Sequence, residues 1–314
     1  MPVVIAYQSL NSNSSVNHSV TAANSQHFTR QTQDFYAKTT TEPTVLSYPT
    51  LPVNTPGYSP TIPVQGPPDL IDIAPQGSMK KGEHSDTEFA ALIGSKMAQM
   101  HQGVFRAFGQ QCDLLTIGEL DSSHPQWSTL QQTVGSFLYS TDQAKACNCF
   151  SVHGNAHISE VIAESKSAGW IAVKVGSVVA VFVHVPNSIA KKASDSQTFY
   201  SKMRDKVAKK GHSIDLIMGD TNQGSDKFTP NVVSAALGGA FKDAHASSSI
   251  SPGDFFGKTV TGTNSNATKK YDVVVYNTAT ITSIEVQYIS QFSPSGYNAY
   301  AVTDHMGVVV KVSK

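Results

Sequence analysis

The sequence predicts an α/β fold in which helices cover mostly buried strands. Residues 69–314 alternate helical apolar spacing with short apolar runs, which is the pattern of a layered α/β domain. Apolar residues make up 39% of the 314-residue chain, enough to fill a sizeable core. The composition changes sharply near residue 68, so we expect the folded domain to span residues 69–314.

The segment 1–68 is predicted to be a disordered leader or linker, rich in Pro, Ser and Thr. It holds nine of the 15 prolines and only four charged residues, so it buries too little apolar surface to offset the entropy of ordering. Its beginning lacks the basic and apolar regions of a signal peptide. The alternative interpretation is a delivery or docking leader whose information lies in residues 1–40.

The folded domain is predicted to begin with a helix that Ser85 or Asp86 caps. Its apolar residues follow a spacing of three and four as far as Phe108, so one face packs on a core. Directly afterwards, Asp113–Glu119 is a short apolar run that ends in an acid, which predicts a buried strand.

A hairpin with glycine in its turn is predicted for residues 170–184. A helix is expected around residues 199–210, and residues 246–268 look like a long surface loop. The remaining predicted strands are Ile214–Asp220, Tyr271–Tyr276 and Met306–Val312.

Charge and cysteine content exclude several classes of protein. The 23 Lys and Arg residues balance 23 Asp and Glu residues, so no global basic field exists and a polyanion must be gripped locally. Three cysteines, two of them separated by one residue, do not form a disulfide scaffold. No apolar run approaches the roughly 20 residues that a membrane helix needs, so we expect a soluble protein without a membrane span.

Polar residues stand at the ends of four predicted strands. Each is ordinary turn chemistry by itself. Together they supply carboxylates for a hard cation, histidines that titrate near neutrality and an amide that can hold a phosphate oxygen. This is the inventory for metal-assisted phosphoester hydrolysis, and its members are Glu119, His184, Asp220 with Asn222, and Asp304 with His305.

Five short motifs, in order over residues 113–312, resemble the endonuclease/exonuclease/phosphatase (deoxyribonuclease I-like) superfamily. They are Asp113-Leu-Leu-Thr-Ile-Gly-Glu119, Val181-Phe-Val-His184, Ile217-Met-Gly-Asp220-Thr-Asn222, Tyr271-Asp272-Val-Val-Val and Thr303-Asp304-His305. The resemblance implies a four-layer sandwich with two facing mixed β-sheets flanked by helices. Gln76-Gly77-Ser78 is similar to the branch of the cytolethal distending toxin catalytic subunit.

The resemblance also implies the role of each site residue. Glu119 and Asp304 would lie at a Mg²⁺ ion, with Mn²⁺ or Ca²⁺ as alternatives. His305 would act on the nucleophilic water or the phosphate, and Asp272 would orient its ring. Asp220 would position or deprotonate water. Asn222 would hold the phosphate, and His184 would contact the phosphate or protonate the leaving oxygen.

The chain departs from the family at two motifs. The first strand is sought at residues 72–78, where Ala74 stands in place of the family's Asn. Thr221 replaces the usual Phe between Asp220 and Asn222. Glu160 and Glu164 are candidates for a further acid that partners a histidine in some nucleases.

Other polar residues have less specific patterns. The spacing of Cys147, Cys149, His153 and His157 departs from common structural zinc sites. Lysine pairs at 191–192 and 269–270 stand near the motifs and are candidates for contact with a phosphate backbone.

The leading hypothesis is a Mg²⁺-dependent phosphodiesterase, a nuclease that cleaves DNA. It would act as a secreted or injected toxin or effector, with delivery machinery that recognises the N-terminal segment and a cognate immunity protein. The alternatives are a phosphatase of phosphoinositides or other small phosphoesters and a catalytically inactive binding protein of the same fold. The choice among DNA, RNA and lipid substrates stays open.

Overall fold

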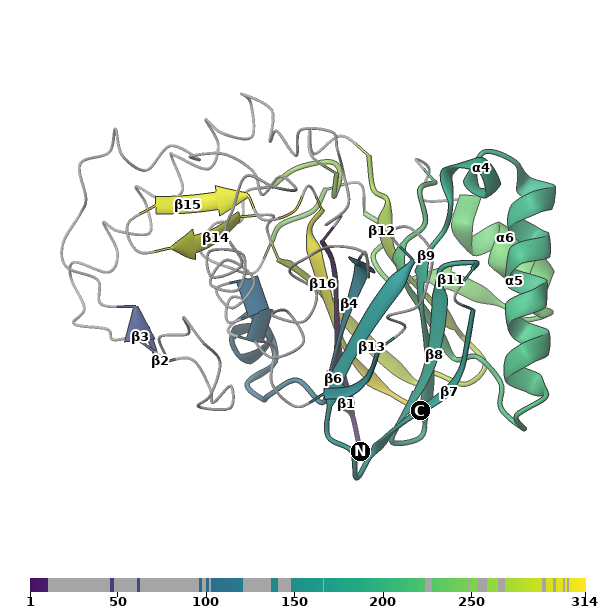
Figure 1. The fold of residues 1–314 in the computed structure, drawn as a ribbon, viewed down its shortest axis with the longest axis horizontal. Helices are drawn as coiled ribbons and strands as arrows, with labels where there is room; N and C mark the ends of the chain where they lie inside the picture. Colours follow the sequence, from purple (N-terminus) through teal and green to yellow (C-terminus); the bar gives the residue numbers. More distant parts are fainter. Residues whose placement is uncertain are drawn as a thin grey trace.

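Two six-stranded β-sheets face each other in the computed structural model (Figure 1). The structure describes residues 1–10, 46–47, 61–62, 96–120 except 98, 99 and 102, 137–140, 148–301 except 166, 224–227, 248, 253–258, 265–268, 290–291 and 296–297, and then 303 and 305–314.

The first sheet has the order β13-β16-β1-β4-β6-β5. β1 and β4 pair in parallel and the other pairs are antiparallel, so the sheet is mixed. Its strands are β1 (Val3–Ser9), β4 (Leu114–Leu120), β5 (Phe137–Ser140), β6 (Cys149–Gly154), β13 (Ser283–Ile289) and β16 (Gly307–Ser313).

The second sheet has the order β11-β12-β10-β9-β8-β7, with β9 and β10 in parallel. Gly176 turns the β8–β9 hairpin at a φ of 58°, as predicted from the sequence. The strands are β7 (Ser159–Ser165), β8 (Trp170–Val175), β9 (Val178–His184), β10 (Leu216–Asp220), β11 (Phe241–Asp243) and β12 (Asp272–Asn277). Two short strand pairs join β2 (Leu46–Ser47) to β3 (Thr61–Ile62) and β14 (Phe292–Ser295) to β15 (Asn298–Ala301).

Apolar side chains fill the space between the two sheets. Alternate residues of each strand point to this interface, as the period of two along a strand requires. Tyr7 of β1 and Phe182 of β9 are fully buried there and stack with ring centroids 6.0 Å apart. The inner faces of both sheets thereby form one core.

Helices cover the outer face of each sheet. On the second sheet lie α4 (Asn187–Ala190), α5 (Ala193–Ala208) and α6 (Phe228–Leu237) (Figure 1). They bury Phe199, Met203 and Val233 against it. On the first sheet lie helical residues within 96–108, where Met100 packs against Gly307 of β16. The predicted α/β fold with two mixed sheets flanked by helices is therefore confirmed. Among the described residues, no helix is long and apolar enough to cross a membrane.

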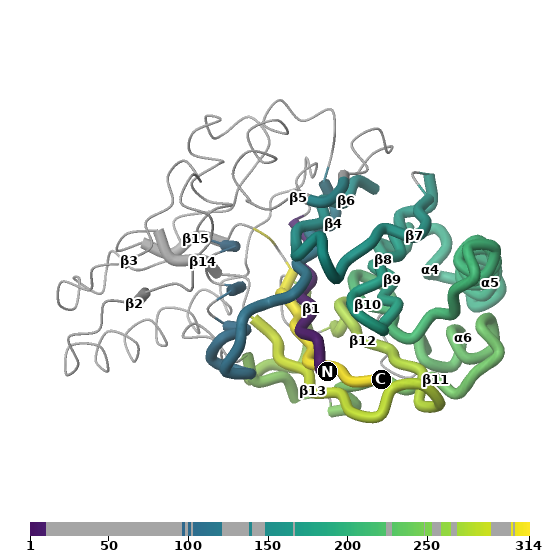
Figure 2. Tube along the Cα trace, turned by 90° about the horizontal axis from the view of Figure 1, so that it is seen from below, coloured from purple at the N-terminus to yellow at the C-terminus, as the bar shows by residue number. Residues whose placement is uncertain are grey.

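The interpretation of residues 1–68 as a leader outside the fold is wrong for residues 1–10. β1 lies between β16 and β4 in the middle of the first sheet (Figure 2). All seven of its residues are buried. Its apolar, partly β-branched run Val3–Tyr7 is a strand that pairs on both edges. The first strand is therefore Val3–Ser9, and residues 72–78, where the sequence analysis placed it, lie outside the described residues.

Candidate active site

Three predicted site residues lie in one row across the second sheet. Asp220 at the end of β10 pairs in register with His184 of β9 on one side and with Asp272 of β12 on the other. Residues in register point to the same face of a sheet. Phe182 and Met218, two residues earlier in β9 and β10, belong to the core between the sheets, so the row continues that inner face at its rim.

Gly219 is the residue that lets β9 and β10 approach at this row. Its φ is 135°, and a Cβ there would collide with the carbonyl oxygen of Val183. A side chain at this position would push Asp220 away from His184, because the clash is with backbone on the neighbouring strand.

Glu119 reaches the same point from the first sheet. Its φ is 55°, and the pairing of β4 with β6 shifts register between Ile117 and Leu120. A left-handed conformation costs a non-glycine residue on the order of 1 to 3 kcal/mol, so the surrounding contacts must hold it. Those contacts are Ser9 Oγ, which donates a hydrogen bond to Glu119 Oε2, and His184 Nε2, which lies 3.0 Å from Glu119 Oε1.

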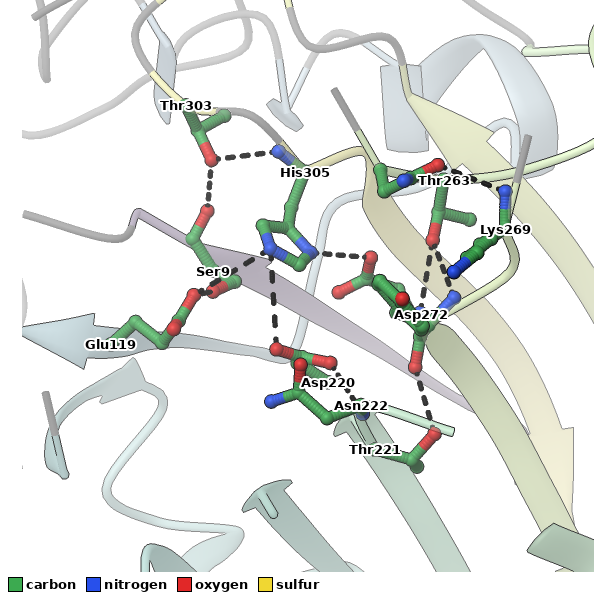
Figure 3. Close-up of polar contacts among 12 residues, drawn as sticks. Ser9, Glu119, Asp220, Thr221, Asn222, Thr263, Lys269, Asp272, Thr303 and His305 are labelled. Atoms are coloured by element: carbon green, nitrogen blue, oxygen red, sulfur yellow. Dashed lines mark hydrogen bonds and ion pairs between the residues drawn. The ribbon is translucent and has the colours of Figure 1, made fainter. Parts of the chain in front are cut away.

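His305 stands between the two sheets with Asp272 behind it (Figure 3). His305 Nδ1 lies 2.8 Å from Asp272 Oδ2, the contact expected from the sequence. Nε2 faces the other acids, 3.9 Å from Glu119 Oε2 and 4.0 Å from Asp220 Oδ2. With Nδ1–H donating a hydrogen bond to the carboxylate of Asp272, Nε2 is the nitrogen that faces the centre.

The backbone around His305 is fixed from two directions. Thr303 Oγ1 accepts a hydrogen bond from His305 N at 3.1 Å and donates one to Ser9 O at 2.6 Å. Thr263 Oγ1 accepts a hydrogen bond from Asp272 N at 3.0 Å. These buried threonines hold the His305–Asp272 pair in place (Figure 3).

Asp220 is a buried acid with a raised pKa. Burial and the charges of Glu119 and Asp272 together raise the pKa of Asp220 to about 7, although the charges of His305 and His184 lower it. Asn222 N donates to Asp220 Oδ1 at 2.7 Å, which is possible because Asn222 adopts a φ of 52°. Asn tolerates this left-handed conformation better than most residues.

Asn222 and Thr221 belong to a buried polar network beneath the rim. Asn222 Nδ2 donates one of its two hydrogens to Val185 O at 2.9 Å, which leaves a second hydrogen for a ligand. Thr221 Oγ1 donates to Tyr271 O at 3.0 Å and accepts a hydrogen bond from Thr229 Oγ1 at 3.5 Å. The network continues through Gln223, so Thr221 makes polar contacts where the family usually has Phe.

The donor set fits a divalent cation. In the part of the chain that the structure describes, the His, Cys, Asp and Glu side chains close enough to share an ion are Glu119, His184 and Asp220, with ligand atoms within 4.8 Å of one another. Two buried carboxylates facing each other are unfavourable without a nearby cation. Carboxylate oxygens suit Mg²⁺ and Ca²⁺, while imidazole suits Mn²⁺ and heavier metals.

The structure brings together Glu119, His184, Asp220, Asp272 and His305, and it places Asn222 beside Asp220. Asp304 lies outside the described residues. Sequence reasoning missed Ser9, Thr263 and Thr303 as supporting residues. The apolar run at residues 3–7 is the signal that leads to Ser9, because a strand there ends at Ser9, beside Glu119.

Other residues singled out from the sequence have different positions. Glu164 Oε1, on β7 of the second sheet, accepts a hydrogen bond from Tyr139 of β5, in the first sheet, at 2.7 Å. Glu160 is exposed on β7. Lys270 is 2% exposed and pairs with Asp243 at 2.8 Å, so its ammonium does not face a substrate.

Among the described residues, the cysteines and histidines between 147 and 157 do not form a group that could share a metal ion. Cys149 is a buried free thiol, and His153 Nε2 lies 2.6 Å from Ser151 Oγ, which accounts for a polar contact of that ring. His157 is exposed, and Cys147 lies outside the described residues.

No protein-family model and no curated protein matches the sequence. D. rerio TDP2 complexed with single-strand DNA product is similar at 11% identity over 100% of this chain and 99% of that chain, with a TM-score of 0.47. An endonuclease/exonuclease/phosphatase family protein from Bacteroides thetaiotaomicron is similar at 12% identity over 71% and 86% of the two chains, with a TM-score of 0.45. A mannosyl-6-phosphatase from B. thetaiotaomicron VPI-5482 is similar at 12% identity over 72% and 92%, with a TM-score of 0.44.

Proposed function

We propose that this protein is a metal-dependent phosphoester hydrolase whose substrate is a nucleic acid strand, with DNA favoured. The observation that carries the proposal is the convergence of Glu119 from the first sheet with His184, Asp220, and the His305–Asp272 pair, all within 4.0 Å contacts at one rim. A structural ion pair does not need two histidines and three acids in one buried group.

Each residue of the group has a task in an in-line displacement at phosphorus. A divalent cation held by Glu119, His184 and Asp220 would neutralise negative charge on the phosphate. His305 Nε2, with Asp272 behind the ring, accepts or donates a proton at the centre. Asp220 has a pKa of about 7 in the metal-free site, and binding of the cation would displace its proton. The remaining amide hydrogen of Asn222 can bind a phosphate oxygen.

His184 is suited to the side of the leaving group. It is the most exposed member of the group, with a side-chain exposure of 12%, while Asp220 and Asp272 are essentially buried. Where the two carboxylates hold the cation without His184, a proton donor at this solvent edge can protonate a departing alkoxide and be reprotonated by water.

A preference for DNA and a role as a delivered toxin are predictions from the sequence motifs. The role as a toxin, with delivery machinery and an immunity protein, relied on the Pro-rich N-terminal segment and on the similarity of Gln76-Gly77-Ser78 to the toxin branch. Residues 3–9 form a central strand, so the Pro-rich segment follows this strand of the fold. Delivery as a toxin stays a prediction from the sequence.

The decisive experiment compares substrate classes with the full chain. Plasmid DNA, single-strand DNA, RNA and phosphoinositides are incubated with Mg²⁺, with Mn²⁺ and with EDTA. We expect cleavage of nucleic acid that needs the cation and that falls about 10²-fold or more in Glu119→Gln, which keeps the shape and removes the charge. Release of phosphate from phosphoinositides without cleavage of nucleic acid would favour the phosphatase alternative. No hydrolysis of any substrate would favour the inactive binding protein.

A further inference from the structure

A groove lies on the outer side of the second sheet, between helix α5 and the turn that joins β7 to β8. Its volume is about 410 Å³, within the range of ligand sites. Side chains of the floor are apolar and those of the walls carry hydroxyl and ammonium groups. The residues that the argument uses are Ser165, Ser167, Trp170, Thr198, Lys202 and Lys206.

The charge of the groove is positive on a chain whose formal net charge is zero. Lys202 and Lys206 stand four residues apart on α5, so their side chains emerge from the same face of the helix. Asp195, nearer the start of α5, is the one acid of the lining. Within the described residues, no ion pair joins either lysine to an acid, so both ammonium groups are available to an anion.

Trp170 positions one of the two cations. Lys206 Nζ lies 5.5 Å from the centre of the Trp170 ring, a cation–π geometry that holds the ammonium over the groove. Trp170 itself is 2% exposed and packs with Phe199, so the floor is rigid. A cation held over a rigid floor loses little entropy when it meets an anion.

Residues beside each wall of the groove form hydrogen bonds with residues of the candidate active site or next to it. In the β7–β8 turn, Gly169 O accepts a hydrogen bond from His184 N at 2.8 Å. In α5, Ser196 Oγ accepts one from Gln223 Nε2 at 2.9 Å, and Gln223 directly follows Asn222. The groove is therefore held in a fixed position relative to the active site.

We propose that this groove is a subsite for a backbone phosphate of the nucleic acid strand, one that is not itself cleaved. Lys202 and Lys206 bind that phosphate, and the hydroxyls of Ser165, Ser167 and Thr198 add donors around it. The inference rests on the proposed function and adds a specificity element to it. Because the chain has no global positive field, a local pair of lysines is what selects a polyanion over a small phosphoester.

The test compares two double variants with the same change of charge. The groove variant carries Lys202→Glu and Lys206→Glu. The control variant carries Lys209→Glu and Lys210→Glu, at exposed residues just beyond the end of α5 and outside the groove lining. Each variant and the wild type are assayed on a single-strand DNA 12-mer and on bis(4-nitrophenyl) phosphate, which is too short to reach beyond the centre.

We expect KM for the 12-mer to be at least about 10-fold higher in the groove variant. The slope of the logarithm of its binding constant against the logarithm of salt concentration should become shallower by roughly 0.7 for each lost phosphate contact. Its kcat/KM for bis(4-nitrophenyl) phosphate stays at the wild-type value. The control variant changes KM for the 12-mer less than 3-fold. Equal effects of the two variants, or no effect of the groove variant, would overturn the subsite.

Failure of the proposed function has a different signature, because the wild type would then cleave neither substrate. In that case binding of a labelled 12-mer, followed by fluorescence anisotropy with all three proteins, still decides the inference. Loss of binding in the groove variant alone supports a polyanion site, and binding equal to that of the wild type refutes it.

Discussion

Asp220 is an acid buried between other acids, and its burial determines how it acts. Its exposed fraction is 1%, and the pKa of about 7 lies far above the value near 3.9 of an unfolded chain. Between pH 4 and 7 the folded protein retains a proton that the unfolded chain has released. Stability of the metal-free protein therefore falls as the pH rises through this window, and it stays lower above pH 7.

Asp220→Asn removes the loss of stability that ionisation of Asp220 causes. Its Oδ1 can still accept the hydrogen bond from Asn222 N. In EDTA at pH 8 we expect its melting temperature to exceed that of the wild type by on the order of 5 °C, and at pH 4.5 we expect the difference to be much smaller. Thermal denaturation at both pH values measures this, with Asp195→Asn at an exposed position of α5 as the control. A difference independent of pH would show that Asp220 is ionised in the metal-free fold. Hydrolysis should fall in the same variant.

His305 and Asp272 are expected to act as one unit. His305→Ala should lower the rate by about 10² to 10⁴ if the ring performs acid–base work, and Asp272→Asn should lower it because the ring loses its fixed orientation. The double variant should be little slower than His305→Ala, because the aspartate acts through the histidine. Kinetics of the three variants, with cation binding measured by titration, test this. Fully additive effects would assign Asp272 a separate role.

At the scale of elements, β1 has the most surprising position. It is the first strand in the chain and a central strand of the sheet, paired with β16 near the end of the chain and with β4 more than 100 residues later. Val4, Ile5 and Tyr7 are fully buried. Removal of this strand would leave β4 and β16 with unpaired backbone in the middle of a buried sheet.

Deletion of residues 1–10 should therefore prevent folding, contrary to the interpretation of this segment as a removable leader. Ile5→Asp tests the same point without shortening the chain, because it places a charge in the core between the sheets. We expect both proteins to lack the cooperative thermal transition of the wild type. Ser283→Asp, at an exposed position of β13 in the same sheet, is the control. A truncated protein that melts cooperatively and hydrolyses the substrate would refute the role of β1.

The elements that the sequence predicted well are those with strong local patterns. The β8–β9 hairpin has two β-branched runs around a glycine, β10 ends at Asp220, and β4 ends one residue after Glu119. β1 was misjudged because its apolar run stands beside a long polar, Pro-rich segment, and composition averaged over 68 residues hides seven of them. Helix α6 and strands β6, β7 and β13 carry no motif and were not predicted.

The candidate site was predictable to the extent that chemistry marks it in the sequence. Glu119, Asp220 and His305 stand at strand ends in motifs, but Ser9 and Thr263 are common residue types in polar surroundings. Only the pairing of strands brings Ser9 beside Glu119, which is 110 positions away in the chain. Contacts between distant segments that depend on register cannot be inferred from local patterns.

At the scale of the whole molecule, the site connects the two sheets. Glu119 lies on β4 of the first sheet, and His305 lies just before β16 of that sheet. The second sheet contributes His184, Asp220 and Asp272. An ion held by Glu119, His184 and Asp220 would be bound by both sheets at once. Such an ion binds the folded chain and not the unfolded one, so it must stabilise the pairing of the sheets.

Cation binding should therefore raise the melting temperature. At a cation concentration of 100 times its Kd the gain in unfolding free energy is about 2.7 kcal/mol, and it should grow from pH 6 to pH 8 as Asp220 loses its proton. Thermal denaturation in EDTA, Mg²⁺ and Mn²⁺ measures the gain, and the larger effect identifies the preferred ion. Glu119→Gln should abolish it, because one sheet then loses its charged ligand. Glu160→Gln, at an exposed site on β7, should retain it. If the cation stabilised Glu119→Gln as much as the wild type, the ion would bind elsewhere and would not join the two sheets.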